Sequence, residues 1–191
     1  MRIKQSIEES IELKTRILND EELLRRIGDA VDICVESLNN GGKILFCGNG
    51  GSAADAQHLA AELSGRFYFD REPLYAEALH VNSSYLTAVA NDYSYDEIYS
   101  RLIKAMGKEG DVLIGLSTSG NSGNVVNAFK TARKLEMKTV GLTGENGGRM
   151  KELSDILLDV PSKDTPRIQE SHILIGHIIC ELIETKIFGQ E

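Results

Sequence analysis

The chain has 191 residues, of which 41% are hydrophobic, and this length is enough to bury a full core as one domain over residues 1–191. Its net charge of −8 argues against nucleic acid or an anionic membrane as a partner. The three cysteines are far apart in apolar contexts and no run of apolar residues is long enough to span a membrane, so we expect a cytoplasmic protein with reduced core thiols.

The first 39 residues predict two helices. A helix over 2–18 carries a thin apolar stripe formed by Ile3, Ile7, Ile11 and Leu18. Such a stripe suits a helix that packs across another subunit, and an ordinary surface helix is the alternative. Asn19 and Glu22 fit a capping box that begins a second helix over 20–39, whose wider apolar face predicts packing in the core.

The next stretch predicts a strand, a glycine-rich turn and a helix. Residues 43–47 are a short apolar run, and three glycines in 48–52 permit positive φ and close approach of a ligand. Ser52 is a good N-cap residue for a helix over 52–65. This arrangement suits an anion, although packing alone also produces such turns.

The same helix carries His58 and Glu62, which lie one turn apart on one face. The pair suits a metal ion or acid/base chemistry, and a solvated helix face is the alternative. The flanking alanines argue against a solvated face, which would normally carry Lys or Arg.

The rest of the chain alternates strands with helices. Strands are expected at 75–79, 111–116, 139–142 and 156–160, and helices at about 82–90, 95–106, 123–135, 147–153 and 166–188. Near-continuous apolar runs of this kind are typical of an open α/β sheet whose strands are parallel and covered on both faces. In such sheets ligands bind beyond the carboxyl ends of the strands.

Polar residues follow the strand at 111–116. Four hydroxyls occur in six residues, on Ser117, Thr118, Ser119 and Ser122. Hydroxyls together with the N–H groups of a helix N-terminus satisfy a phosphate monoester without a lysine, although serine-rich loops are common.

The last helix carries two histidines, His172 and His177. Spacing alone does not choose between them as functional residues, because a lone helical His beside apolar residues is usually packed in the core. We interpret His80, which follows a strand, as structural.

Four segments together resemble the sugar isomerase (SIS) domain family, and most closely its phosphoheptose isomerase branch. They are FCGNGGSAADAQHLAAELSGRF, LTAVANDYSYDEIYSR, GLSTSGNSGNVV and TPRIQESHILIGHIICELIE, and the likeness covers nearly the whole chain. The Ser/Thr loop alone would indicate only a SIS domain. The Gln-His-x3-Glu pattern at 57–62, together with Gln169 and His177, is much more specific.

The resemblance implies a three-layer α/β fold in which a five-stranded parallel sheet is flanked by helices. The helical pair at 1–39 would pack in a homotetramer, and residues 43–191 would form the α/β core of the single SIS domain. The implied reaction converts D-sedoheptulose 7-phosphate into D-glycero-D-manno-heptose 7-phosphate, the first step of ADP-heptose synthesis for the lipopolysaccharide core.

The resemblance also implies roles for individual residues. Glu62 and His177 match the acid/base pair, and one Zn²⁺ per subunit would be held by His58, Glu62, Gln169 and His177. Substrate-contacting positions match Asn49, Gly50, Gly51, Ser52, Glu62, Asn91, Asp92, Ser117, Thr118, Ser119, Ser122 and Gln169. One departure is Pro166, where some members have an acidic residue, and Asp164 is a weak substitute for it.

The spacing of the implied zinc ligands raises a geometric question. Gln169 and His177 are eight residues apart, roughly 12 Å along an ideal helix with a 1.5 Å rise per residue. Either Gln169 precedes the regular helix, or the site draws on a neighbouring subunit. We expect the site to lie at a subunit interface.

Two other functions compete with the enzyme. One is a non-catalytic SIS protein that binds a DNA-replication initiator protein, and the other is a phosphosugar-sensing domain. Sensing domains are usually fused to a DNA-binding module, and the sequence shows neither such a module nor a basic patch. Because the chain keeps Glu62 and His177, we favour the enzyme.

Overall fold

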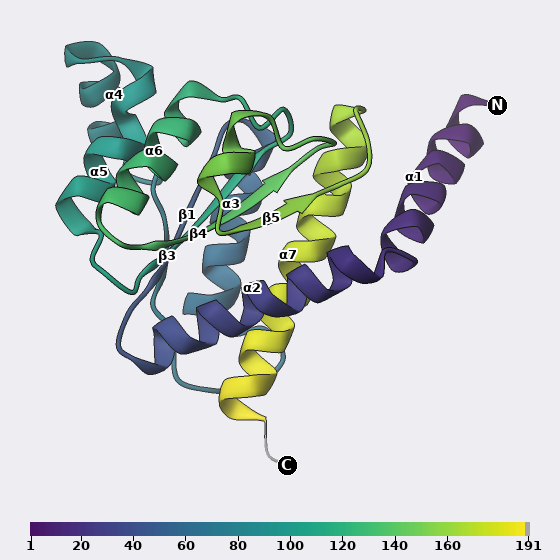
Figure 1. Ribbon diagram of the computed structural model, residues 1–191, viewed down its shortest axis with the longest axis horizontal. Coiled ribbons are helices and arrows are strands. Elements are labelled where there is room, and N and C mark those ends of the chain that lie inside the picture. The colour runs from purple at the N-terminus through teal and green to yellow at the C-terminus, as the bar shows by residue number, and fades with distance from the viewer. Residues whose placement is uncertain (190–191) are drawn as a thin grey trace.

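The computed structural model describes residues 1–189 and contains a parallel sheet of five strands (Figure 1). The strand order is β2-β1-β3-β4-β5, and Ile44 in β1 lies between Ala76 in β2 and Val112 in β3. The strands are β1 (Ile44–Gly48), β2 (Ala76–Ala78), β3 (Val112–Ser117), β4 (Lys138–Thr143) and β5 (Ile156–Asp159). The expected five-stranded parallel sheet is therefore confirmed.

Alternate residues of each strand enter two different cores, which makes the fold three-layered. In β1, Ile44 and Phe46 pack on one face, whereas Leu45 and Cys47 pack on the other. The first face is covered by α1 (Arg2–Leu18), α2 (Glu21–Asn39), α3 (Gly51–Ser64) and α7 (Thr165–Phe188). The second is covered by α4 (Ser83–Asp92), α5 (Ile98–Met106) and α6 (Gly123–Lys134).

Short helical segments differ in detail from the expectation. The segment expected as one helix over 95–106 begins with the 3₁₀ turn η1 (Tyr95–Glu97), and η2 (Gly148–Leu153) is also 3₁₀. Helix α4 continues through Asp92, so Asn91 and Asp92 form its last turn. The expected helix end near residue 90 was therefore two residues too early.

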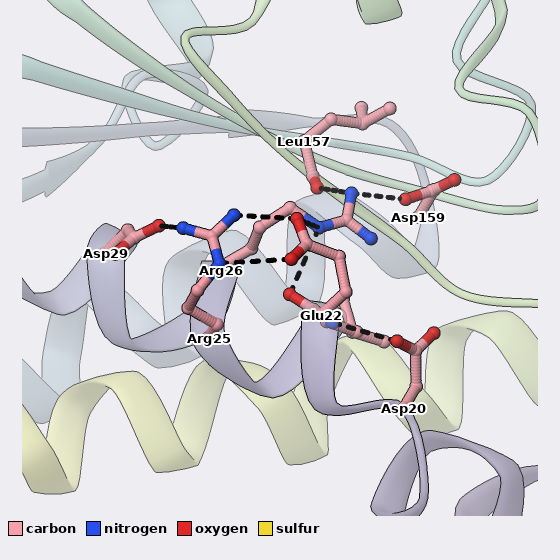
Figure 2. Close-up of polar contacts among 8 residues, drawn as sticks. Asp20, Glu22, Arg25, Arg26, Asp29, Leu157 and Asp159 are labelled. Carbon is pink, nitrogen blue, oxygen red and sulfur yellow. Dashed lines mark hydrogen bonds and ion pairs between the residues drawn. The ribbon is translucent and has the colours of Figure 1, made fainter.

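The helix caps correct the sequence interpretation at two places. Figure 2 shows that Asp20 caps α2, since its Oδ1 accepts the Leu23 N–H at 2.9 Å. The capping box from Asn19 was therefore wrong, and Glu22 pairs with Arg25 at 2.7 Å instead. Helix α3 begins at Gly51 after Gly50, so Ser52 is buried in the first turn and is not the N-cap.

Arg26 anchors α2 to the edge of the sheet (Figure 2). Its Nη1 donates to the Leu157 carbonyl at 2.5 Å and to Asp159 Oδ1 at 2.8 Å. Both acceptors belong to β5, so the second N-terminal helix is attached to the last strand.

Helix α1 extends away from the sheet, with the N-terminus at its far tip (Figure 1). Leu13 and Ile17 are buried, and Ser10 Oγ donates to Glu170 Oε2 of α7 at 2.9 Å. The apolar stripe predicted for this helix is exposed, at Ile3, Ile7, Ile11 and Leu18. Packing within residues 1–189 therefore leaves the stripe uncovered.

A buried ion pair ties β1 to β3 at the amino edge of the sheet. Lys43 Nζ donates to Asp111 Oδ2 at 2.6 Å, and the same carboxylate accepts the backbone N–H of Lys43 and Lys108. Both side chains are almost fully buried.

Across residues 1–189, we find no helix with the length and apolar character needed to cross a membrane.

Candidate functional site

The glycine-rich turn and the Ser/Thr loop meet at the switch point of the sheet. Strands β1 and β3 are neighbours, with Gly48 opposite Leu116, and the chain leaves them towards opposite faces, into α3 and α6. Ligands of open parallel sheets bind at this point, beyond the carboxyl ends of the strands. The topology therefore brings together two loops that lie about 70 residues apart in the sequence.

A reciprocal amide pair joins the two loops. Asn49 Nδ2 donates to Asn124 Oδ1 at 2.9 Å, and Asn124 Nδ2 donates back to Asn49 Oδ1 at 2.8 Å. Tyr95 Oη also donates to Asn49 Oδ1, at 3.1 Å. The sequence analysis did not identify Asn124. Its partner Asn49 lies far away in the sequence, and Asn124 itself looks like an ordinary polar residue in a helix.

The hydroxyls of the Ser/Thr loop gather at the amino end of α6. Ser117 Oγ lies 2.9 Å from Ser122 Oγ, and Ser119 Oγ accepts the Asn121 N–H at 3.1 Å. A pocket of about 200 Å³ lies against the loop, lined by Thr118, Ser119, Glu145, Ser162, Lys163, Thr165 and Ile168. Hydroxyls and a helix N-terminus suit a phosphate, while the Lys163 ammonium in this pocket is paired with Glu145 at 3.3 Å.

Asn91 and Asp92 lie just before Tyr95, whose hydroxyl contacts Asn49 in the glycine-rich turn. Both side chains are exposed, and Asn91 Nδ2 donates to Asp92 Oδ1 at 2.9 Å. Tyr95, which follows them, reaches Asn49. The residues are therefore placed on a segment that borders the turn.

Three of the four implied metal ligands come together between α3 and α7. One ligand atom from each of His58, Glu62 and His177 lies within 4.8 Å of the other two. His58 Nε2 is 2.9 Å from Glu62 Oε1 and 3.4 Å from His177 Nε2. The side chain of His58 is 49% exposed and that of Glu62 is 25% exposed, so the cluster is open to solvent in the single chain.

Close packing of α3 against α7 makes this cluster possible. A Cβ atom on Gly176 would lie 2.5 Å from Leu59 Cδ1, and Cys180 Sγ lies 3.8 Å from the Leu59 carbonyl oxygen. The glycine at 176 leaves room for the Leu59 side chain against the backbone of α7. His58 and His177, which adjoin these contact residues, therefore face each other with ring centroids 4.9 Å apart.

Gln169 lies at the other end of the same helix pair. Helix α7 begins at Thr165, so the idea that Gln169 precedes the regular helix was wrong. A Cβ atom on Gly51 would lie 2.7 Å from Gln169 Nε2, which places this amide against the glycine-rich turn. Within one chain, Gln169 therefore borders the turn, two helical turns away from His177.

The beginning of α7 also bears on Asp164 and Pro166. Asp164 is the exposed N-cap residue, and its side chain makes no capping hydrogen bond among the residues described. Pro166 lies in the first turn, where its missing N–H costs nothing.

The cluster of His58, Glu62 and His177 fits a divalent metal ion. Two ligands about 2.0–2.1 Å from a tetrahedral Zn²⁺ lie roughly 3.3 Å apart, close to the 3.4 Å between the two Nε2 atoms. Within one chain, these three ligands would leave the fourth tetrahedral position open. Two imidazoles and a carboxylate suit several first-row metals as well as zinc.

Asp55 is a carboxylate beside the cluster that the sequence analysis did not single out. Burial raises its pKa, while the nearby His58 and His177 act in the opposite direction. Its Oδ2 is buried and has no hydrogen-bond partner among residues 1–189. It lies one turn before His58 on α3.

His172 points into the core rather than towards the cluster. It is fully buried, and its Nε2 lies 3.0 Å from the Thr143 carbonyl, which accepts the N–H. Burial lowers the pKa of His172 to about 4, so the imidazole is neutral near pH 7. The structure thus separates two histidines that spacing could not, by placing His177 alone against His58.

Comparison with known proteins gives full-length matches. A family model described as SIS domain matches residues 7–144. The chain is 54% identical to a phosphoheptose isomerase of Aneurinibacillus thermoaerophilus, covering 97% of this chain and 94% of that protein. It is 51% identical to a phosphoheptose isomerase of Clostridium acetobutylicum, and the match covers 99% of this chain and 96% of that protein. The solved phosphoheptose isomerase of Neisseria gonorrhoeae superposes with a TM-score of 0.91, at 44% identity over 96% and 97% of the chains.

Removal of either histidine of the cluster should abolish tight metal binding. Titration of metal-free protein with Zn²⁺ should show His58→Ala and His177→Ala weakened by at least on the order of 100-fold, since even indirect metal partners contribute 10- to 100-fold. His172→Gln removes an imidazole from the same helix outside the cluster and should bind as the natural protein does. Equal losses in His172→Gln and His177→Ala would contradict the assignment.

His172 should make stability depend on pH. Its pKa is about 4 when folded and about 6.5 when unfolded, so the unfolded chain binds more protons between these values. The free energy of unfolding should therefore fall as pH drops from about 6.5 to 4, by up to about 1.4 kcal/mol per unit. Urea melts of metal-free protein should show a smaller slope for His172→Gln, and an unchanged slope would contradict the prediction.

Proposed function

This chain belongs to the SIS domain family, in its phosphoheptose isomerase branch, and from that premise we propose that it isomerises D-sedoheptulose 7-phosphate to D-glycero-D-manno-heptose 7-phosphate. Relatives at 51–54% identity over almost their entire length carry this enzyme's name. The observation that carries the proposal is the meeting of His58, Glu62 and His177 in a chain whose Ser/Thr loop suits a phosphate.

We assign the phosphate to the Ser/Thr loop. The net charge of −8 provides no general attraction for an anion, so binding depends on local groups. Hydroxyls and the N–H groups at the start of α6 supply them. The proposed substrate contacts are Asn49, Gly50, Gly51, Ser52, Glu62, Asn91, Asp92, Ser117, Thr118, Ser119, Ser122 and Gln169.

We assign the proton transfers to Glu62 and His177. Aldose–ketose isomerisation moves a proton between C1 and C2 and needs a second group for the proton on oxygen. The contact between Glu62 and His58 uses Oε1, so Oε2 is the oxygen that we assign to the carbon-bound proton. We assign the oxygen-bound proton to His177, whose roles as proton carrier and metal ligand would alternate. Zn²⁺, held by His58, Glu62 and His177 with Gln169, would supply Lewis-acid stabilisation of negative charge on the substrate oxygen.

We propose that a second copy of the chain completes the site in a homotetramer. The cluster is partly exposed in one chain, whereas proton transfer from carbon benefits from exclusion of water. Gln169 lies roughly 12 Å along α7 from His177, at a rise of 1.5 Å per residue, so a single ion would take these two ligands from different subunits. The exposed stripe on α1 offers an apolar surface for such an assembly.

The wider assignments follow from these proposals. We treat residues 1–191 as one SIS domain, because α7 packs against both α2 and α3. The product would feed ADP-heptose synthesis for lipopolysaccharide. The buried free thiols of Cys34, Cys47 and Cys180 suit the reducing cytoplasm, where we place the reaction.

The natural protein supplied with Zn²⁺ should convert sedoheptulose 7-phosphate into the aldose. Glu62→Gln should lower kcat by on the order of 100-fold or more, as expected for loss of a general base. Glu109→Gln, which changes an exposed carboxylate at the amino edge of the sheet, should leave the rate unchanged. No turnover by the natural protein, together with tight binding to a replication initiator protein, would favour the non-catalytic alternative.

Subunit mixing should distinguish a shared site from a site within one chain. Glu62→Gln and Gln169→Ala should each be inactive alone. If the two residues act from different subunits, co-assembly of equal amounts should restore about a quarter of the sites, since each of the two residues comes independently from an unsubstituted donor half the time. No recovery in verified mixed oligomers would contradict the shared site.

A further inference from the structure

A buried ion pair lies beyond the metal cluster, between α7 and the segment that follows α3. Glu184 lies seven residues after His177 on α7 and is 1% exposed, and the side chain of Arg71 is 2% exposed. Arg71 Nε donates to Glu184 Oε1 at 2.8 Å. Neither residue belongs to the cluster of His58, Glu62 and His177.

Glu184 holds the backbone of the segment after α3. Its carboxylate accepts the N–H groups of Phe67 at 2.9 Å, Tyr68 at 2.6 Å and Phe69 at 3.0 Å. Burial works against the charged form, but these three donors and Arg71 outweigh it and keep the pKa of Glu184 below its ordinary value. The carboxylate is thus charged and has four donors.

Arg71 fixes the carboxyl end of α3. Its Nη1 donates to the carbonyls of Leu63 at 2.9 Å and Gly65 at 3.1 Å, and its Nη2 donates to the carbonyl of Glu62 at 3.1 Å. The last carbonyls of a helix have no partner within the helix and need one from elsewhere. The guanidinium therefore holds the turn that carries the Glu62 side chain.

The same segment also contacts the other half of the cluster. The ring of Phe67 lies 5.8 Å from the ring of His177, tilted by 56°. Because Glu184 binds the N–H of Phe67, the ion pair is connected to His177 through Phe67 and to Glu62 through Arg71.

We propose that Glu184 and Arg71 are positioning residues for the metal and proton-transfer cluster, which they act on by fixing Glu62 and Phe67 against α7. They touch neither metal nor substrate. The inference rests on the proposed function for its kinetic consequence, but its consequence for metal binding does not depend on the substrate.

The chain contains a matched control for a purely structural role. Lys43 and Asp111 form another buried ion pair in which the carboxylate also accepts backbone N–H groups. That pair lies at the amino edge of the sheet, at the opposite end of β1 from the glycine turn. Substitution there should lower stability without changing the cluster.

The test compares Glu184→Gln with Asp111→Asn in the full-length protein. Glu184→Gln should weaken Zn²⁺ binding by about 10- to 100-fold, as for loss of groups that orient metal ligands, and should lower kcat while KM changes less than about two-fold. Asp111→Asn should lower the denaturation midpoint and leave Zn²⁺ affinity and kcat as in the natural protein.

Two milder variants keep the inference testable if Glu184→Gln does not fold. Arg71→Lys keeps the charge but loses the forked donors, and Phe67→Leu keeps an apolar side chain but removes the ring from His177. Each should weaken Zn²⁺ binding. Natural Zn²⁺ affinity in the folded variants would overturn the inference, whereas absence of turnover by the natural protein would overturn only the proposed substrate.

Discussion

The site depends on the close contact between α3 and α7. A Cβ atom at residue 176 would lie 2.5 Å from Leu59 Cδ1, so the glycine lets Leu59 pack directly against the backbone of α7. The helices run parallel, since Gly51 adjoins Gln169 and Leu59 adjoins Gly176. One contact therefore has consequences at both ends of the pair. It places Gln169 against the glycine turn, and it places His177 against His58.

Carboxylates in this fold differ in how completely their oxygens are bonded. Asp111 and Asp155 lie at the amino edge of the sheet and accept N–H groups from neighbouring strands. The Glu184 carboxylate likewise accepts hydrogen bonds from three backbone N–H groups and a guanidinium. Glu62 differs, because its side chain is partly exposed and its contact is with the imidazole of His58. A carboxylate whose oxygens all accept hydrogen bonds holds the backbone in place. A carboxylate with fewer hydrogen bonds is available to bind a metal ion or a proton.

The fold could be predicted from local patterns, but parts of the site could not. Apolar runs located all five strands, and the one-turn spacing identified His58 and Glu62 as a pair. His172 and His177 are five residues apart and so lie on different sides of a helix, but only the packing of α7 shows which of them faces His58. Asn124 and Glu184 were missed because their partners lie far away in the sequence. The cap of α2 was misplaced by one residue because Asn19 and Asp20 are both good capping residues.

The arrangement of groups along α7 argues that one chain presents two half-sites. The Ser/Thr loop and Gln169 lie at the carboxyl edge of the sheet, whereas His177 lies two helical turns further along. A metal ion at the cluster would have an open coordination position. About half of the His58 side chain is exposed in the chain over residues 1–189. In the proposed assembly, a neighbouring copy would cover the cluster with its own switch-point loops. It would then supply both the phosphate-binding Ser/Thr loop and the amide ligand Gln169. In the proposed homotetramer, the exposed α1 stripe would supply apolar contacts between subunits.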